Sequence, residues 1–117
     1  MLTLKENADL ASHPILGAQI PELRETDVAI LHGAILEEIC GISKEAQAAK
    51  TNLWYPQDAQ AALADLRGGK GDCLFLMNAT PPPVVRKVAE AGEVMPQKST
   101  FFYPKVATGL TIHLLDP

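Results

Sequence analysis

The feature that most constrains the fold is an uninterrupted run of apolar residues in the middle of the chain, Cys73-Leu74-Phe75-Leu76-Met77. Gly71 and Asp72 precede this run, and Asn78 follows it. A short apolar run bounded by turn residues is typical of a strand that is covered on both faces of a sheet. We therefore expect residues 73–77, called the apolar segment below, to form a central strand.

Before the apolar segment, the clearest pattern is helical. Residues 26–40 repeat apolar side chains at steps of three and four, which places them on one face of a helix. Thr26 or Asp27 can accept the free amide hydrogens at its start, and Gly41 can take a left-handed conformation at its end. Residues 43–50 predict a shorter helical turn.

Two further helices flank the apolar segment. The first begins at Asp58, which can cap it, carries a narrow stripe of alanines and leucines, and ends at the glycines of residues 68–71. The second begins at Thr80 and ends at Gly92. Three prolines follow Thr80, and the first turn of a helix tolerates proline. We expect Thr80 to be its cap.

Other stretches predict strands beside the central one. Residues 51–55 form an expected strand that ends before Pro56. In residues 110–115 the apolar Leu110, Ile112 and Leu114 alternate with the other side chains, and residues 2–4 alternate briefly. Interleaved helices and strands favour an α/β fold, with α+β as the alternative. We expect one layered domain over residues 1–117, with a small mixed sheet and three main helices.

The composition of the chain limits the classes of molecule that it can bind. The 117 residues are 47% hydrophobic and carry a formal net charge of −4. That apolar fraction suits a folded core, and the acidic balance argues against non-specific nucleic-acid binding. No apolar run reaches the roughly 18 residues of a membrane span, and the first residues show no signal-peptide pattern, so we expect a cytoplasmic protein. Cys40 and Cys73 are expected as buried thiols, with a disulfide as the alternative.

Familiar catalytic motifs are missing. The glycine–lysine pair within residues 68–72 lacks the earlier glycine and the following Ser or Thr of a phosphate-binding loop. The cysteines and histidines show no zinc-ligand spacing, so we expect no metal. No Gly-x-Ser-x-Gly nucleophile motif occurs.

The first candidate site is the segment of residues 95–105, called the lysine loop below. Its hydroxyl and ammonium groups could hold a phosphate or a carboxylate. They belong to Lys98, Ser99, Thr100, Tyr103 and Lys105. The alternative is a solvated loop whose aromatic residues seal the core.

The second candidate site is at Asn78 and Thr80, between the expected central strand and a helix start. Ligands of α/β folds favour that place, and helix N-termini attract anions. A simple capping role for Thr80 explains the same residues. His32 is expected to pack or cap and not to catalyse, and Trp54 is expected to be buried, with a stacking surface as the alternative.

Several segments together resemble a known family. Residues 72–81 read DCLFLMNATP, and residues 89–105 read AEAGEVMPQKSTFFYPK. Both, with residues 27–32 (DVAILH), resemble the family catalogued as domain of unknown function 1015. Ala79 and Gln97 stand where that family has proline. Family members are several times longer, and this chain resembles only their C-terminal part.

The resemblance implies a function for the longer protein. The upstream part of full-length members carries an Asp-Gly-His-His-Arg element that is similar to one in free serine kinases related to the ParB and sulfiredoxin fold. The resemblance thus implies a phosphotransferase-like protein, with a nucleotide as the cofactor of full-length members. This chain lacks that element, so we expect it to contribute a ligand-contacting loop and not to be catalytic alone.

The sequence leaves two functions open. In the first, Lys98 and Lys105 attract an anionic small molecule, and Ser99, Thr100 and Asn78 orient it by hydrogen bonds. Glu93 is a weaker candidate that would position Lys98. In the second, the chain is a non-catalytic structural or oligomerisation module, and a homodimer is expected.

Overall fold

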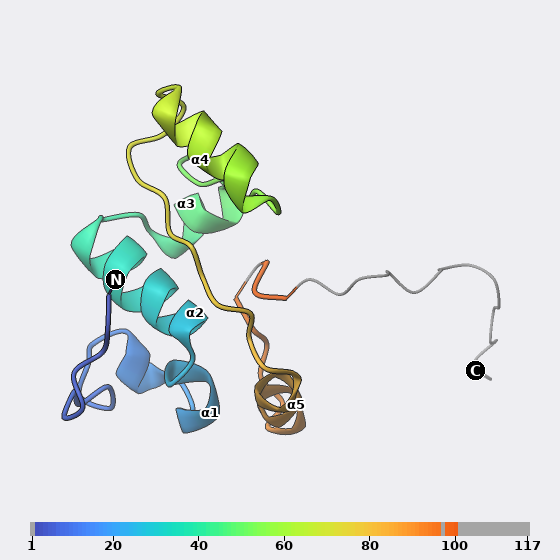
Figure 1. The fold of residues 1–117 in the computed structure, drawn as a ribbon. Coiled ribbons are helices and arrows are strands. Elements are labelled where there is room, and N and C mark those ends of the chain that lie inside the picture. The colour runs from blue at the N-terminus through green and yellow to red at the C-terminus, as the bar shows by residue number, and fades with distance from the viewer. Residues whose placement is uncertain (1, 97, 101–117) are drawn as a thin grey trace, which may run out of the picture.

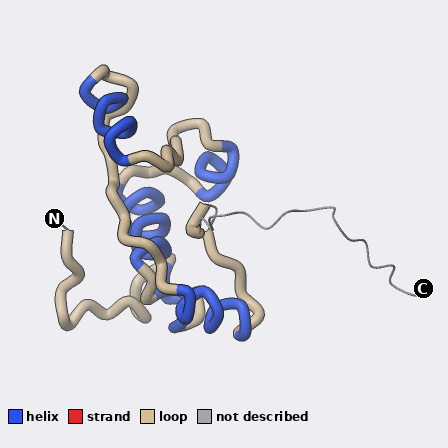
Figure 2. Tube along the Cα trace, turned by 45° about the vertical axis from the view of Figure 1, so that its right-hand side comes forward, coloured by secondary structure: helices blue, strands red, loops and turns tan. Residues whose placement is uncertain are grey.

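The computed structural model describes residues 2–96 and 98–100, and this part of the chain is predominantly helical (Figure 1). The helices follow one another along the chain as short elements joined by loops (Figure 2). In chain order they are η1 (Leu16–Ala18), α1 (Pro21–Arg24), α2 (Asp27–Ile30), η2 (Leu31–Ile39), α3 (Lys44–Ala49), α4 (Ala59–Arg67) and α5 (Pro82–Glu90).

The predicted mixed sheet is wrong, and with it both the α/β and the α+β class. Residues 2–4, 51–55 and 73–77 carry no strand, and no strand occurs anywhere in the described residues. A strand needs hydrogen-bond partners from another segment, and the apolar segment instead runs as loop between α4 and α5 (Figure 2). The expected strand over residues 110–115 lies outside the described part.

The helix predicted over residues 26–40 is confirmed as the continuous pair α2 and η2. Thr26 caps it, because its Oγ1 accepts the Ala29 N–H at 3.1 Å. Gly41 follows its end with φ of +69°, as expected. From Leu31 onward the helix is wider than an α-helix, and at its end the Cys40 N–H donates five residues back to the Ile35 carbonyl at 2.9 Å.

Of the three other expected helix starts, two are confirmed. Ser43 caps α3 by accepting the Ala46 N–H, and Asp58 caps α4 by accepting the Ala61 N–H at 2.6 Å. The predicted Thr80 cap is wrong, since Pro81 is the cap residue of α5 and no side chain caps this helix. The prolines explain why: two first-turn residues have no N–H, and the Val84 N–H already donates to the Pro81 carbonyl at 2.9 Å.

The core lies between α1, α2, η1 and α5. Leu16 and Val88 are fully buried, and Leu23 and Ala29 complete the cluster. Several half-buried apolar side chains pack around it: Leu10, Ile20, Ile30, Ala34 and Met95. This core links α5, and the loop that follows it, to the N-terminal helices.

Two expectations about burial are wrong. Cys40 and Cys73 are both exposed free thiols, because Cys40 ends η2 and Cys73 belongs to a segment without a covering sheet. Trp54 is 58% exposed for the same reason, since the strand that would have turned it inward did not form. Among the described residues, no helix is long and apolar enough to cross a bilayer.

Candidate functional site

The turn after α5 places the lysine loop. Gly92, with φ of +77°, donates its N–H to the Ala89 carbonyl at 3.0 Å, and the Glu93 N–H donates to the Val88 carbonyl at 3.1 Å. This pair of bonds is a Schellman motif, which a left-handed residue such as glycine allows. The chain therefore reverses and returns beside α5, where Met95 packs against the core.

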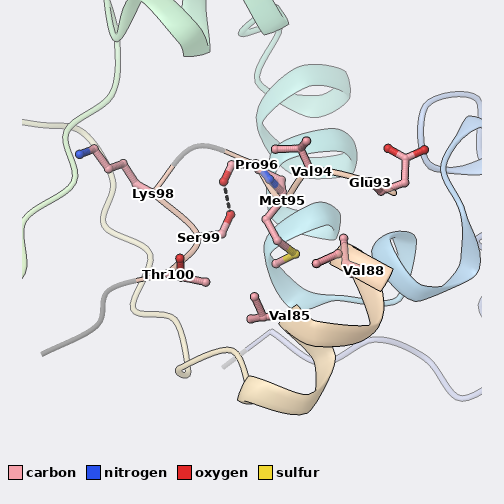
Figure 3. A pocket seen from close by; sticks show the side chains of 10 residues that line it. Val85, Val88, Glu93, Val94, Met95, Pro96, Lys98, Ser99 and Thr100 are labelled. Atoms are coloured by element: carbon pink, nitrogen blue, oxygen red, sulfur yellow. Dashed lines mark hydrogen bonds between the residues drawn. The ribbon is translucent and has the colours of Figure 1, made fainter. Parts of the chain in front are cut away.

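A cavity of about 330 Å³ lies between α5 and the returning chain (Figure 3). We call it the loop cavity. Its apolar walls are Val85, Val88, Ala89, Val94, Met95 and Pro96. Its polar residues are Glu93, Lys98, Ser99 and Thr100, so the described polar residues of the lysine loop meet at one site.

Lys98 has an unusual backbone for its residue type. Its φ is +60°, in the left-handed region that side chains other than glycine rarely adopt. The side chain is exposed and extends away from Val85 and Val88 (Figure 3). Its ammonium group therefore lies at the outer side of the loop cavity and leaves the apolar wall uncharged. Strained residues of this kind cluster at ligand-binding sites.

The two hydroxyl groups differ in what they can offer. Ser99 Oγ donates to the Pro96 carbonyl, and the Ser99 N–H donates to the same oxygen at 3.3 Å. Both Ser99 donors are thus in use, and its hydroxyl can only accept from a ligand. The Thr100 hydroxyl donates to no other described residue. Lys98 and Thr100 are therefore the side-chain donors that an anion could meet here.

Glu93 does not position Lys98 in this arrangement. The two side chains lie on opposite sides of Met95 (Figure 3), and no ion pair joins them within the described part of the chain.

Asn78 and Thr80 line a different hollow, of about 730 Å³, between α1, the start of α2 and α5. We call it the acidic cleft. Its charged residues are Glu22, Glu25, Asp27 and Glu90 against the single cation Lys87. The α5 N-terminus adds no free first-turn donor, as described above. The acidic cleft therefore disfavours anions, and the structure separates Asn78 and Thr80 from the lysine loop.

The remaining predicted site residues, Tyr103 and Lys105, lie outside the described residues. Over the part that the structure does describe, no group of His, Cys, Asp and Glu side chains is arranged to hold a metal ion.

Sequence reasoning missed a polar cluster around Gln47, which is only 7% exposed. Gln47 Nε2 donates to the Ile42 carbonyl at 2.8 Å and to the His32 carbonyl at 3.2 Å. Because both amide hydrogens are used, Gln47 Oε1 accepts from His32 Nδ1 at 2.6 Å. His32 thus packs, as expected, and joins η2 to α3. Nothing in the polar sequence of α3 singles out Gln47.

The His32 ring stacks on Tyr55, with ring centroids 6.5 Å apart and an interplanar angle of 6°. The Tyr55 hydroxyl is buried and has no hydrogen-bond partner among the described residues. Burial raises the pKa of Tyr55 above its usual value of 10.0. This cluster fastens residues 51–55 to the helices and lies apart from the loop cavity.

Comparison of the chain with protein-family models, with curated proteins and with solved structures finds no match.

Proposed function

We propose that the lysine loop contacts a small molecule that carries an anionic group and an apolar part. The observation that carries this proposal is the loop cavity, which is lined by Lys98 and Thr100 together with the apolar residues Val85 and Met95. The ammonium group and the hydroxyl would bind the anion, and the wall would cover the apolar part.

The resemblance extends this proposal to a larger protein. We propose that the chain supplies this contact within a cytoplasmic, phosphotransferase-like protein of the serine-kinase type, and that it is not catalytic alone. Phosphate is then the preferred anion. Asn78 and Thr80 are left out of the anion contact because carboxylates surround them.

A thermal-shift comparison tests the anion contact. The probes are inorganic phosphate, phosphoserine, ATP, ADP and phenyl phosphate, with the native chain, Lys98→Gln and Lys50→Gln. Lys50 is a matched control because it is also exposed and also left-handed, with φ of +56°. A ligand at a hundred times its dissociation constant stabilises a protein by about 2.7 kcal/mol.

We expect phenyl phosphate to raise the melting temperature of the native chain and of Lys50→Gln but not of Lys98→Gln. If no probe shifts the native chain, or if Lys98→Gln responds like the control, the anion contact is refuted.

A second function, as a non-catalytic assembly module, has its own supporting observation. The apolar segment joins α4 to α5 without a partner among the described residues, and Leu76 and Met77 are 62% and 43% exposed. Apolar surface of this kind favours association.

A further inference from the structure

Within the described residues, the backbone of residues 71–80 has no hydrogen-bond partner. No N–H or carbonyl of these residues is hydrogen-bonded to another described residue, whereas the helices on both sides satisfy theirs. From residue 73 to residue 81 the chain also contains no turn or bend, so it runs drawn out between α4 and α5 (Figure 1). An unpaired, drawn-out backbone is a template on which another chain can form a strand pair.

Within this stretch, the side chains of the apolar segment are only partly covered. Cys73 is exposed together with Leu76 and Met77, while Leu74 and Phe75 are half-buried. The 58% exposed Trp54 extends the patch, because its ring reaches within 4.0 Å of the position that a Cβ on Gly71 would occupy. The patch thus combines apolar side chains with backbone groups that no other described residue pairs.

We propose that the apolar segment pairs with the apolar segment of a second copy of this chain, antiparallel and centred on Phe75. This inference rests on the assembly function proposed above and is independent of the anion contact. It names the partner and the interface, which that function leaves open.

The arrangement follows from the sequence of the segment itself. With Phe75 opposite its own copy, Leu74 faces Leu76 of the other chain and Cys73 faces Met77, so every apolar residue meets an apolar residue. A shift by two residues in one direction puts Asp72 opposite Leu76, and in the other direction it puts Leu74 opposite Asn78. The centred register also pairs Asp72 with neutral Asn78, whereas parallel in-register pairing would set Asp72 beside Asp72.

Sedimentation velocity over a range of concentrations measures the association, with Leu76→Lys compared to Ile39→Lys. Ile39 is 77% exposed at the end of η2, outside the patch, so it controls for adding a lysine at an exposed apolar site. We expect Leu76→Lys to weaken dimerisation by about tenfold or more, because a desolvated charge replaces apolar contact. Ile39→Lys should leave it unchanged.

Disulfide trapping tests the register without depending on affinity. In a Cys40→Ser background, Met77→Cys places a new thiol opposite Cys73 of the other copy. Directly opposite residues have Cα atoms about 4.5–5.5 Å apart, which suits a disulfide. Within one drawn-out chain the two positions are about 13 Å apart, which excludes an internal bond. Oxidation should give a covalent dimer, and adding Cys73→Ser should abolish it.

Each outcome is decisive. A concentration-dependent dimer that Leu76→Lys weakens and that the thiol pair traps supports the proposal. A dimer that is indifferent to Leu76→Lys refutes this interface while the assembly function stands. A chain that stays monomeric refutes both. Hydrogen exchange identifies another occupant: if the amides of residues 73–77 are protected in a monomer, another part of the same chain covers them, and the proposal fails.

Discussion

Replacing Gly33 by alanine tests how closely η2 packs on η1, which contains Leu16. A Cβ added at Gly33 would lie 2.8 Å from Leu16 Cδ2 and 3.3 Å from Ile15 Cγ2. Leu16 is fully buried and cannot turn toward solvent. The extra methyl group therefore has to push apart the two segments that form the core.

The expected sign is opposite to that of helix propensity. In an exposed helix, a change from glycine to alanine stabilises by about 1 kcal/mol. Overpacking a core costs about 1–3 kcal/mol. We therefore expect Gly33→Ala to lower the free energy of unfolding by about 1 kcal/mol, and the melting temperature by about 4 °C for a chain of 117 residues.

Thermal and urea unfolding, followed by circular dichroism, measure the change. In the double variant with Leu16→Val, which shortens the opposing side chain, part of the loss should be recovered as a coupling of about 0.5 kcal/mol or more. A Gly33→Ala chain that is more stable than the native one, or an additive double variant, would refute the close packing of η2 on Leu16.

Two further predictions concern the left-handed lysines and the buried hydroxyl of Tyr55. Lys98→Gly and Lys50→Gly should each raise the free energy of unfolding by about 0.5–1 kcal/mol, because glycine adopts a positive φ without strain. Only Lys98→Gly should lose the response to phenyl phosphate. If urea unfolding shows that both variants are less stable than the native chain, the prediction is contradicted. Tyr55→Phe should stabilise by about 1 kcal/mol, since it removes a buried hydroxyl that lacks a partner among the described residues. Burial raises the pKa of Tyr55 in the folded chain, so folding disfavours its ionised form. The free energy of unfolding is therefore insensitive to this group below pH 10 and falls as the pH rises from 10 through the folded pKa. The phenylalanine variant should lack this alkaline loss, and unfolding curves from pH 8 to 11 would show whether it does.

The helices from α2 to α5 could be predicted from the sequence because a helix satisfies its own backbone. Thr26 and Asp58 cap the helices that they were expected to cap. Gly41 adopts the left-handed conformation expected of it, and Gly92 ends its helix as expected. Each of these features depends on residues within one or two turns. Local sequence therefore contains the information that decides them.

The predicted strands are wrong because, unlike a helix, a strand forms only with a partner from another segment. The apolar segment shows which side chains avoid water, but it does not show what covers them, and the described residues supply no pairing strand. The expected burial of Cys73 and Trp54 failed for the same reason. The candidate site was partly predictable: Lys98 and Thr100 share one cavity, whereas the acidic surroundings of Asn78 come from α1 and α2, far away in the sequence.

Calorimetric titration of phenyl phosphate into the native chain and into Lys98→Gln measures the proposed anion contact of the lysine loop. Removing a charged hydrogen-bond donor should weaken binding about tenfold or more. We predict saturable binding by the native chain and at least that loss in Lys98→Gln. Equal affinity of the two chains, or no binding by the native chain, would contradict the claim.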